Sequence, residues 1–500
     1  MNIMKNQFVT SEGMTPSAPR TTTGLVTGQP ATAQPNPSRG SSKLRRAIGP
    51  LLAAAATLQA AVVLGGPPAY TFKPIAFVGG PTPGGSTFNG DFEPSGMNNR
   101  GECAFVADYE VNGVEGEGIF IGGAGEGLRQ VLGFGQPAPG TGGGVFGPWE
   151  EGNLGFNDEG DVAILFTLDP FTHWLTWLNG FYAGVWRYSH ETQQLTPVVV
   201  PGDPIPGLGG DTFKGIGLDV SMNNQGTIAF EGIVSVDPLT LGTDGPVDTM
   251  TAGVFVASKH GRISPVALPG GPAPNGDTWD SAVNPSINAA GDMSFGAKTS
   301  GAIAAGRGES IYLRRAATGE ILAVGKAGTP APGGGMLLAG DESRINDRGD
   351  VVFTGYLDGE AISPVGGPVG AFLYRDGTLV RVAGPGDAMP GGGHLAFVSG
   401  YLNNIGLNNS GTVVFTAGLD TVGDEGLYAW SHGSLHLIAR TGTVIPGLGT
   451  ILSLEMGSGL SPSGYPAGSG KLNERGQLVF GCTLTDGRAV LLLATPTGVK

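Results

Sequence analysis

Polar turn residues and apolar strand residues follow one another in a short pattern that recurs seven times along this 500-residue chain. The pattern is Asn-x-x-Gly-x-apolar-(small or apolar)-Phe. Asn at the first position and Gly at the fourth are typical of a type I turn. The seven pairs are Asn98 and Gly101, Asn157 and Gly160, Asn223 and Gly226, Asn288 and Gly291, Asn346 and Gly349, Asn408 and Gly411, and Asn473 and Gly476.

The strand that follows each turn is apolar at successive positions, as in Val351, Val352 and Phe353. The second copy departs from the pattern, because Ile164 stands where the others have Phe. A strand that is apolar on both faces must be covered on both faces. The repeat therefore predicts small sheets stacked face to face.

Each repeat, roughly 60 residues long, carries three further landmarks in constant order. They are a strand of the form Gly-apolar-aromatic, a second strand after a short turn, and a loop of the form Gly-x-x-x-Pro, as at Gly386 to Pro390. Pro fixes φ and Gly permits positive φ, so each loop is a stiff connection to the next unit. We expect each repeat to be a four-stranded meander.

The two ends of the repeat array complement each other. Residues 70–78 form a strand that runs directly into a Gly/Pro loop, as the last strand of a unit does, whereas the final unit stops after its third strand at residues 489–494. A ring in which residues 70–78 complete the last sheet leaves no open edge. The sequence therefore predicts an all-β fold, a seven-bladed β-propeller over residues 70–494. A β-solenoid is the alternative, although it predicts no missing strand.

The seven turns resemble those of the NxxGxxAF tandem-repeat proteins, which are exported bacterial proteins whose members carry various C-terminal anchors. The resemblance covers about residues 70 to 494. It implies export and a repeat architecture, and it implies no established activity.

The N-terminal segment has the features of an export sequence. Residues 1–42 are rich in Thr, Ser, Pro and Gly, so we expect a disordered leader. Within residues 43–69, a basic group at 43–46 precedes an uncharged run at 47–64. Cleavage as a signal peptide and retention of residues 47–64 as a membrane anchor both remain open, and a buried helix is a further alternative. Residues 495–500 form a short tail.

The formal net charge of −15 makes nucleic acid an unsuitable partner, because binding to phosphates needs a basic surface. The chain has two cysteines, Cys103 and Cys482, in the first and last repeats. These repeats are neighbours in a closed ring, so a disulfide is one hypothesis and two buried free thiols are the other.

Aromatic residues are concentrated in the second repeat, mainly in its variable loop. They could stack against a saccharide ring or a partner surface, or pack into an apolar cluster of their own. The candidate ligand-binding residues are Trp149, Phe171, His173, Trp174, Trp177, Phe181 and Tyr182.

Acidic residues recur on the strands expected to lie innermost in the ring. Asp91, Glu93, Asp341 and Glu342 are the candidate ligands for a hard cation such as Ca²⁺, and we expect no other cofactor. Solvated carboxylates are the alternative interpretation.

Known catalytic signatures are absent from the sequence, which has no Gly-x-Ser-x-Gly elbow, His-Glu-x-x-His motif or phosphate loop. The first hypothesis is therefore an exported, monomeric, non-enzymatic scaffold that binds a glycan or an extracellular protein. One alternative is a glycosidase or lyase that uses carboxylates of the central channel. Another is a structural protein of the cell envelope.

Overall fold

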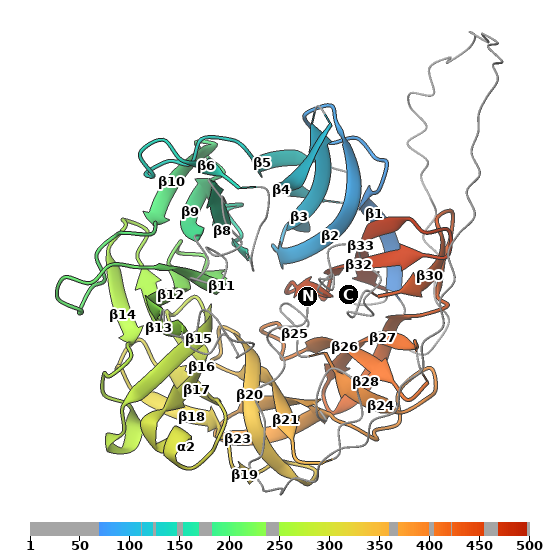
Figure 1. Cartoon of the computed structure of the whole chain (residues 1–500). Helices are drawn as coiled ribbons and strands as arrows, with labels where there is room; N and C mark the ends of the chain where they lie inside the picture. Colours follow the sequence, from blue (N-terminus) through green and yellow to red (C-terminus); the bar gives the residue numbers. More distant parts are fainter. Residues whose placement is uncertain are drawn as a thin grey trace, which may run out of the picture.

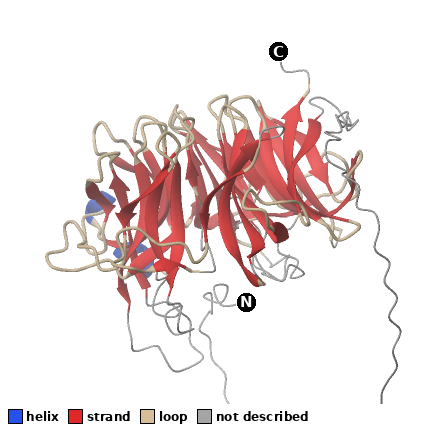
Figure 2. Ribbon diagram, turned by 90° about the horizontal axis from the view of Figure 1, so that it is seen from above, coloured by secondary structure: helices blue, strands red, loops and turns tan. Residues whose placement is uncertain are grey.

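The computed structural model describes residues 70–111, 113–123, 127–147, 154–169, 183–236, 250–359, 369–399, 405–421, 423–454 and 469–497. Seven small antiparallel sheets surround a central axis (Figure 1). In the perpendicular view, the strands run between two rims that carry the turns and loops (Figure 2). The fold is the seven-bladed β-propeller that the repeat predicts.

The blades are numbered here in chain order. Blade 1 contains β2 (Thr87–Met97), β3 (Glu102–Val111), β4 (Val114–Gly123) and β5 (Arg129–Gly133). Blade 2 contains β6 (Val145–Phe146), β7 (Gly155–Phe156), β8 (Val162–Asp169), β9 (Ala183–Ser189) and β10 (Gln194–Val199). Blade 3 contains β11 (Gly215–Met222), β12 (Ile228–Val236), β13 (Met250–Ala257) and β14 (Ile263–Ala267). Blade 4 contains β15 (Trp279–Ile287), β16 (Met293–Thr299), β17 (Ser310–Arg314) and β18 (Ile321–Gly325).

Blade 5 contains β19 (Thr329–Pro330), β20 (Met336–Ile345), β21 (Val351–Leu357), β22 (Val369–Arg375) and β23 (Thr378–Ala383). Blade 6 contains β24 (Leu395–Val398), β25 (Ile405–Leu407), β26 (Val413–Leu419), β27 (Glu425–Ser431) and β28 (Ser434–Arg440). Blade 7 contains β29 (Val444–Ile445), β30 (Gly449–Ser453), β31 (Ser469–Leu472), β32 (Leu478–Leu484), β33 (Ala489–Pro496) and β1 (Tyr70–Phe77). The described helices are short: η2 (Pro274–Gly276) and α2 (Ser300–Ala304).

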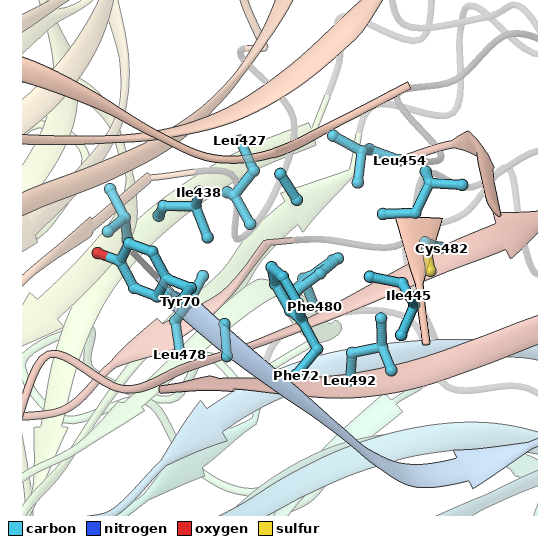
Figure 3. Close-up of a cluster of buried hydrophobic side chains, with 14 of the residues drawn as sticks. Tyr70, Phe72, Leu427, Ile438, Ile445, Leu454, Leu478, Phe480, Cys482 and Leu492 are labelled. Carbon is cyan, nitrogen blue, oxygen red and sulfur yellow. The ribbon is translucent and has the colours of Figure 1, made fainter. Parts of the chain in front are cut away.

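The N-terminal strand closes the ring as predicted. β1 pairs with β33 in antiparallel register, with Tyr70 opposite Pro496. Phe72 is buried and meets Phe480 of β32 edge to face, with ring centroids 6.0 Å apart. Figure 3 shows Tyr70 and Phe72 within an apolar cluster that also contains Leu427 of blade 6. The first strand of the chain therefore joins the last blade to the core.

The core lies between the blades, because the second strand of each blade buries both of its faces. In β21, Val352 packs among residues of blade 6, whereas Phe353 packs against Ile311 and Leu313 of blade 4. All three β21 positions from Val351 to Phe353 are fully buried. The predicted double covering of this strand is confirmed.

Cys103 and Cys482 are buried free thiols in the structure. Cys103 packs between blades 7 and 1, next to Val479 and Leu491, whereas Cys482 packs between blades 6 and 7. Equivalent strands present equivalent faces, so the two thiols lie on opposite sides of blade 7. The disulfide hypothesis is therefore wrong, and burial raises the pKa of the Cys103 thiol.

The predicted leader and export segment, residues 1–69, lie outside the described residues. None of the helices among the described residues has the length and apolar composition that a membrane span needs.

Candidate functional site

The seven repeated Asn side chains are buried, and six of them donate a hydrogen bond to the neighbouring blade, whereas Asn98 donates to Glu102 of its own blade. Within each turn, the glycine N–H donates to the Asn carbonyl, as from Gly349 to Asn346 at 3.0 Å. In six of the turns that carbonyl also accepts from the Asn side chain of the preceding blade. The Nδ2 to O links are Asn157 to Asn223 (3.5 Å), Asn223 to Asn288 (2.9 Å), Asn288 to Asn346 (2.9 Å), Asn346 to Asn408 (3.0 Å), Asn408 to Asn473 (3.2 Å) and Asn473 to Asn98 (3.1 Å).

The residue after each Asn adds an outer set of links. Its backbone N–H donates to the side chain of the same position in the next blade. Ala289 of blade 4 has no side-chain acceptor, so Asn224 of blade 3 cannot make this bond to it. The links are Asn99 to Asp158 (2.7 Å), Asp158 to Asn224 (2.9 Å), Ala289 to Asp347 (2.8 Å), Asp347 to Asn409 (2.7 Å), Asn409 to Glu474 (3.1 Å) and Glu474 to Asn99 (2.9 Å). The turn rim is thus a hydrogen-bonded belt, which makes the repeated Asn a scaffold residue.

The predicted aromatic site cannot be placed, because Trp149, Phe171, His173, Trp174, Trp177, Phe181 and Tyr182 all lie outside the described residues. Trp186, on β9 of the same blade, is described. It is fully buried, and its Nε1 donates to the Pro139 carbonyl at 3.0 Å. This tryptophan has a structural role.

The predicted acidic residues fall on two innermost strands that are not adjacent in the ring. Asp91 and Glu93 lie on β2 of blade 1, and Asp341 and Glu342 lie on β20 of blade 5. Among the described parts of the chain, no group of three or more His, Cys, Asp or Glu side chains is placed to hold a metal ion.

Asp341 and Glu342 belong to a larger set of carboxyl groups in blades 3 to 5, which we call the axial carboxyl cluster. The pKa of Asp341 is raised by the charges of Glu309, Glu342 and Asp219, and that of Glu231 by Asp219 and Glu309. The cluster therefore consists of Asp219 on β11, Glu231 on β12, Glu309 just before β17, and Asp341 and Glu342 on β20. β11 and β20 are innermost strands of their blades (Figure 1).

Local backbone features create the space for these side chains. Glu231 lies over Gly217, where an added Cβ would be 2.1 Å from the Glu231 carboxyl carbon. The Glu231 carboxylate also accepts from the backbone N–H of Asn284, a residue of blade 4 with a φ of 52°. In β20, the ladder to β21 is broken between Gly340 and Ser343 by a bulge that holds Asp341 and Glu342.

Burial and mutual repulsion keep protons on this cluster. Burial is the main cause that raises the pKa of Glu231 to about 8, and Asp219 adds to it. Burial likewise raises the pKa of Asp341 to about 8, ahead of the neighbouring carboxylates, although the Tyr356 hydroxyl donates to Asp341 Oδ2 at 3.3 Å. Burial also raises the pKa of Glu309, against the opposing charge of Lys298. Glu231 and Asp341 therefore keep their protons at neutral pH.

Arg344 is paired directly with the cluster. Arg344 Nη2 forms a buried salt bridge to Glu342 Oε1, and Arg344 Nη1 donates to the Ser343 carbonyl at 2.8 Å. An arginine beside a buried carboxylate favours its ionised form. Glu342 is therefore the salt-bridged neighbour of the proton-holding Asp341.

The sequence reasoning missed Asp219, Glu231 and Glu309. One signal could have identified Asp219, because the position four residues before the repeated Asn is polar in six consecutive repeats: Asn153, Asp219, Asn284, Glu342, Asn404 and Ser469. Glu231 directly follows the repeated aromatic position, where the other copies have Val106, Leu165, Gly296, Thr354, Thr416 and Gly481. It is the single charged residue among the seven copies of that position.

Several solved structures are similar to this chain at low sequence identity. The propeller domain of the Trilobed protease from Pyrococcus furiosus is 9% identical over 83% of this chain and 95% of that one, with a TM-score of 0.43. TolB from Acinetobacter baumannii is 10% identical over 70% of this chain and 64% of that one, with a TM-score of 0.36. A polysaccharide lyase of family PL25, an ulvan lyase, is 10% identical over 71% of this chain and 86% of that one, with a TM-score of 0.38. Likeness at this level carries no argument about activity.

A search of curated proteins finds no match. One family model matches residues 71–494, almost the whole of the described propeller. The chain belongs to the family described as "Family of unknown function (DUF7453)".

Proposed function

We propose that this protein is an exported, monomeric propeller that binds a partner molecule, a glycan or an extracellular protein, without transforming it. The observation that carries the proposal is the axial carboxyl cluster. The Asn, Gly and Phe residues that build the blades recur around the ring, whereas Glu231, Asp341 and Lys298 occupy one sector of it. Buried carboxyl groups cost folding free energy, so their concentration in one sector is typical of a functional site.

Export is supported by the sequence alone. A basic group at residues 43–46 precedes an uncharged run at 47–64, and the turns resemble those of the exported NxxGxxAF tandem-repeat proteins. The membrane contact of this proposal is limited to residues 47–64, if they are retained. Fractionation of cells that express the chain, with N-terminal sequencing of the exported product, tests both points.

A carbohydrate-active enzyme is the second candidate, and one observation favours it. Asp341 retains its proton near neutral pH while Glu342, beside it, is paired with Arg344. Glycosidases use two neighbouring carboxyl groups, one of which holds a proton, for acid and base steps. The structural role in the cell envelope is the third candidate.

Incubation of the chain with a panel of polysaccharides and extracellular proteins, with and without Ca²⁺, separates these functions. Retention of an unchanged partner supports the binding scaffold. New reducing or unsaturated ends would show an enzyme and overturn the proposal. A chain that neither retains nor changes any partner would leave the structural role as the better account.

A further inference from the structure

We propose that the contact between blades 1 and 2 at the turn rim is a pH-sensitive joint, in which a neutral His190 holds the outer strand of blade 1 and a protonated His190 releases it. The partner of His190, which follows β9 of blade 2, is Arg129 on β5 of blade 1. The inference rests on the direction of the hydrogen bond between them, on the charges around the imidazole ring, and on a missing asparagine link at the same junction.

The bond between Arg129 and His190 can have only one direction. Arg129 Nη2 lies 3.0 Å from His190 Nδ1. A guanidinium group has donors and no acceptor, so Nδ1 must carry a lone pair and the proton of the neutral ring must lie on Nε2. Protonation of the ring would turn Nδ1 into a donor that faces another donor. The bond therefore exists only while His190 is neutral.

Both side chains are held in place by their surroundings. The Arg129 guanidinium lies over the Tyr188 ring, 6.0 Å from its centroid. His190 is half-buried, and its backbone N–H donates to Asp161 Oδ1 at 2.9 Å. Its ring covers Gly160, where an added Cβ would lie 3.1 Å from His190 Cγ. Rotation of the ring away from Arg129 is therefore restricted.

Two guanidinium groups flank the imidazole ring. Arg129 approaches it from β5, and Arg100 approaches from the turn of blade 1, since an added Cβ on Gly160 would lie 2.8 Å from Arg100 Nη2. A protonated ring would place a third positive charge beside them, and like charges at this distance repel each other.

The carboxyl groups around the ring already have partners or are exposed to water. Glu102 on β3 forms a salt bridge with Arg100, and Asp161 accepts the backbone N–H of His190. The exposed neighbours are Glu159 and Glu191. These groups offset the charge of a protonated ring in part, but they do not restore its bond to Arg129.

The neutral link found between the other blades is missing at this junction. Six of the repeated Asn side chains donate to a backbone carbonyl of the next blade, as Asn473 does to Asn98 at 3.1 Å. Asn98 itself donates to Glu102 of its own blade at 2.7 Å. An amide-to-carbonyl bond does not change with pH, so the junction of blades 1 and 2 lacks a support that the other junctions keep at any pH.

The bonds that hold this junction involve ionisable side chains. The Asp158 carboxylate accepts from the backbone N–H and from Nδ2 of Asn99, at 2.7 and 3.0 Å, and the Asp158 carbonyl accepts from Arg100. The bond from Arg129 to His190 lies farther out, between the fourth strand of blade 1 and the end of the third strand of blade 2. Histidine is the residue type that normally changes its charge between pH 5 and 8. Acidification over this range therefore breaks the outer bond and leaves the bonds to Asp158.

NMR of the full chain with ¹⁵N-labelled histidine tests the direction of the bond. At pH 7.5 we expect His190 Nδ1 to be unprotonated and Nε2 to carry the proton. The spectrum of His190→Asn identifies which signals belong to His190. A proton on Nδ1 of His190 at pH 7.5 would overturn the proposal.

Hydrogen exchange, read by mass spectrometry, tests the release of the junction. The readout is local, because the protonated carboxyl groups of the axial carboxyl cluster stabilise the whole fold at low pH. With labelling times scaled to the intrinsic exchange rate, protection of residues 129–133 and 189–194 should fall at least about threefold from pH 7.5 to pH 5. Residues 378–383 of blade 5, which contain no histidine, should keep their protection. Unchanged protection of the two junction segments would contradict the proposal.

Variants test whether His190 controls the effect. In His190→Asn, Oδ1 takes the place of Nδ1 as an acceptor that does not titrate, so the junction should keep its protection at pH 5. Arg129→Leu removes the donor and should give low protection at both pH values. His432→Asn replaces an exposed histidine in the equivalent turn of blade 6 and should respond to pH as the parent chain does. Unfolding midpoints establish that the variants are folded. Loss of protection at pH 5 in folded His190→Asn protein, as large as in the parent, would assign the joint to another group and sink the proposal.

Discussion

The repeated Asn side chain combines a local role in its turn with a long-range role between blades. In blade 5, Asn346 Oδ1 accepts from the backbone N–H groups of Arg348 and Asp350, at 3.0 and 2.9 Å. Its Nδ2 donates to the Asn408 carbonyl of blade 6 and to Asp350 Oδ2. All of these bonds are buried or nearly so, which makes each of them costly to lose.

We therefore expect Asn346→Ala to lower the free energy of unfolding by about 2–4 kcal/mol, because several buried partners would lose their bonds at once. Urea denaturation measures this. Asn409→Ala is the matched control and should cost less than about 1 kcal/mol. Blade 4 already has Ala289 at the position of Asn409 and still forms its turn. Equal losses in the two variants would contradict the structural role of the belt.

Gly349 is required by the turn for a different reason. Its φ is +78°, a conformation that a β-branched residue rarely adopts, and an added Cβ would lie 2.1 Å from Arg315 Nη1. Gly349→Val should lower the free energy of unfolding by about 1–3 kcal/mol while leaving ligand affinity unchanged. Gly209→Ala, where an added Cβ would meet nothing within 4 Å, is the control. Loss of binding in folded Gly349→Val protein would place the working surface on the turn rim.

At the scale of elements, β1 determines whether blade 7 is complete. Phe72 is 6% exposed and packs on Phe480, whereas Phe77 on the same strand is 40% exposed. Phe72→Ala should therefore cost about 3–5 kcal/mol, as for a large core residue, and Phe77→Ala much less. Urea denaturation of both variants provides the comparison. If the two substitutions cost the same, closure of the ring by β1 contributes little to stability.

The sequence was sufficient to predict β1 and its partner, because a spare strand at one end and a missing strand at the other are visible in the order of landmarks. The links made by Asn346 to the next blade could not be predicted in this way. A turn signature reports contacts among neighbouring residues, whereas the Asn408 carbonyl is 62 residues away. The role of the Asn side chain in linking two blades becomes visible only in the three-dimensional structure of the ring.

The same limit applies to the candidate site. Asp341 and Glu342 could be predicted because they lie on an innermost strand, where acidic residues are unexpected. Glu231 and Glu309 could not, because one lies on a second strand and the other just before a third strand. Glu231 meets Asp219 within blade 3, whereas Glu309 of blade 4 acts on Asp341 of blade 5 across a blade boundary.

At the scale of the molecule, closure of the ring holds these carboxyl groups together. Blades 3, 4 and 5 each contribute to the axial carboxyl cluster, and the pairing of β1 with β33 closes the ring that holds these blades. The folded state therefore keeps protons on Glu231 and Asp341 that the unfolded chain releases at much lower pH. This difference in proton binding makes stability depend on pH.

Stability should fall as the pH rises from about 4.5 to about 8, because Glu231 has a pKa of 4.5 in the unfolded chain and about 8 in the folded protein. The contribution is fully present below the lower value and is lost at the upper one, at about 1.4 kcal/mol for each unit of pKa shift. Glu231→Gln keeps an acceptor for the Asn284 N–H and cannot ionise. Its stability relative to the parent chain should therefore be higher at pH 9 than at pH 5, by at least about 2 kcal/mol.

Urea denaturation at pH 5, 7 and 9 measures the difference. The control is Glu320→Gln, which removes an exposed carboxylate and should give the same dependence of stability on pH as the parent chain. If the free energy of unfolding changed with pH in the same way for Glu231→Gln and the parent chain, Glu231 would be ionised in the folded protein. Its charge would then have to be balanced by more positive charge than Arg344 and Lys298 provide.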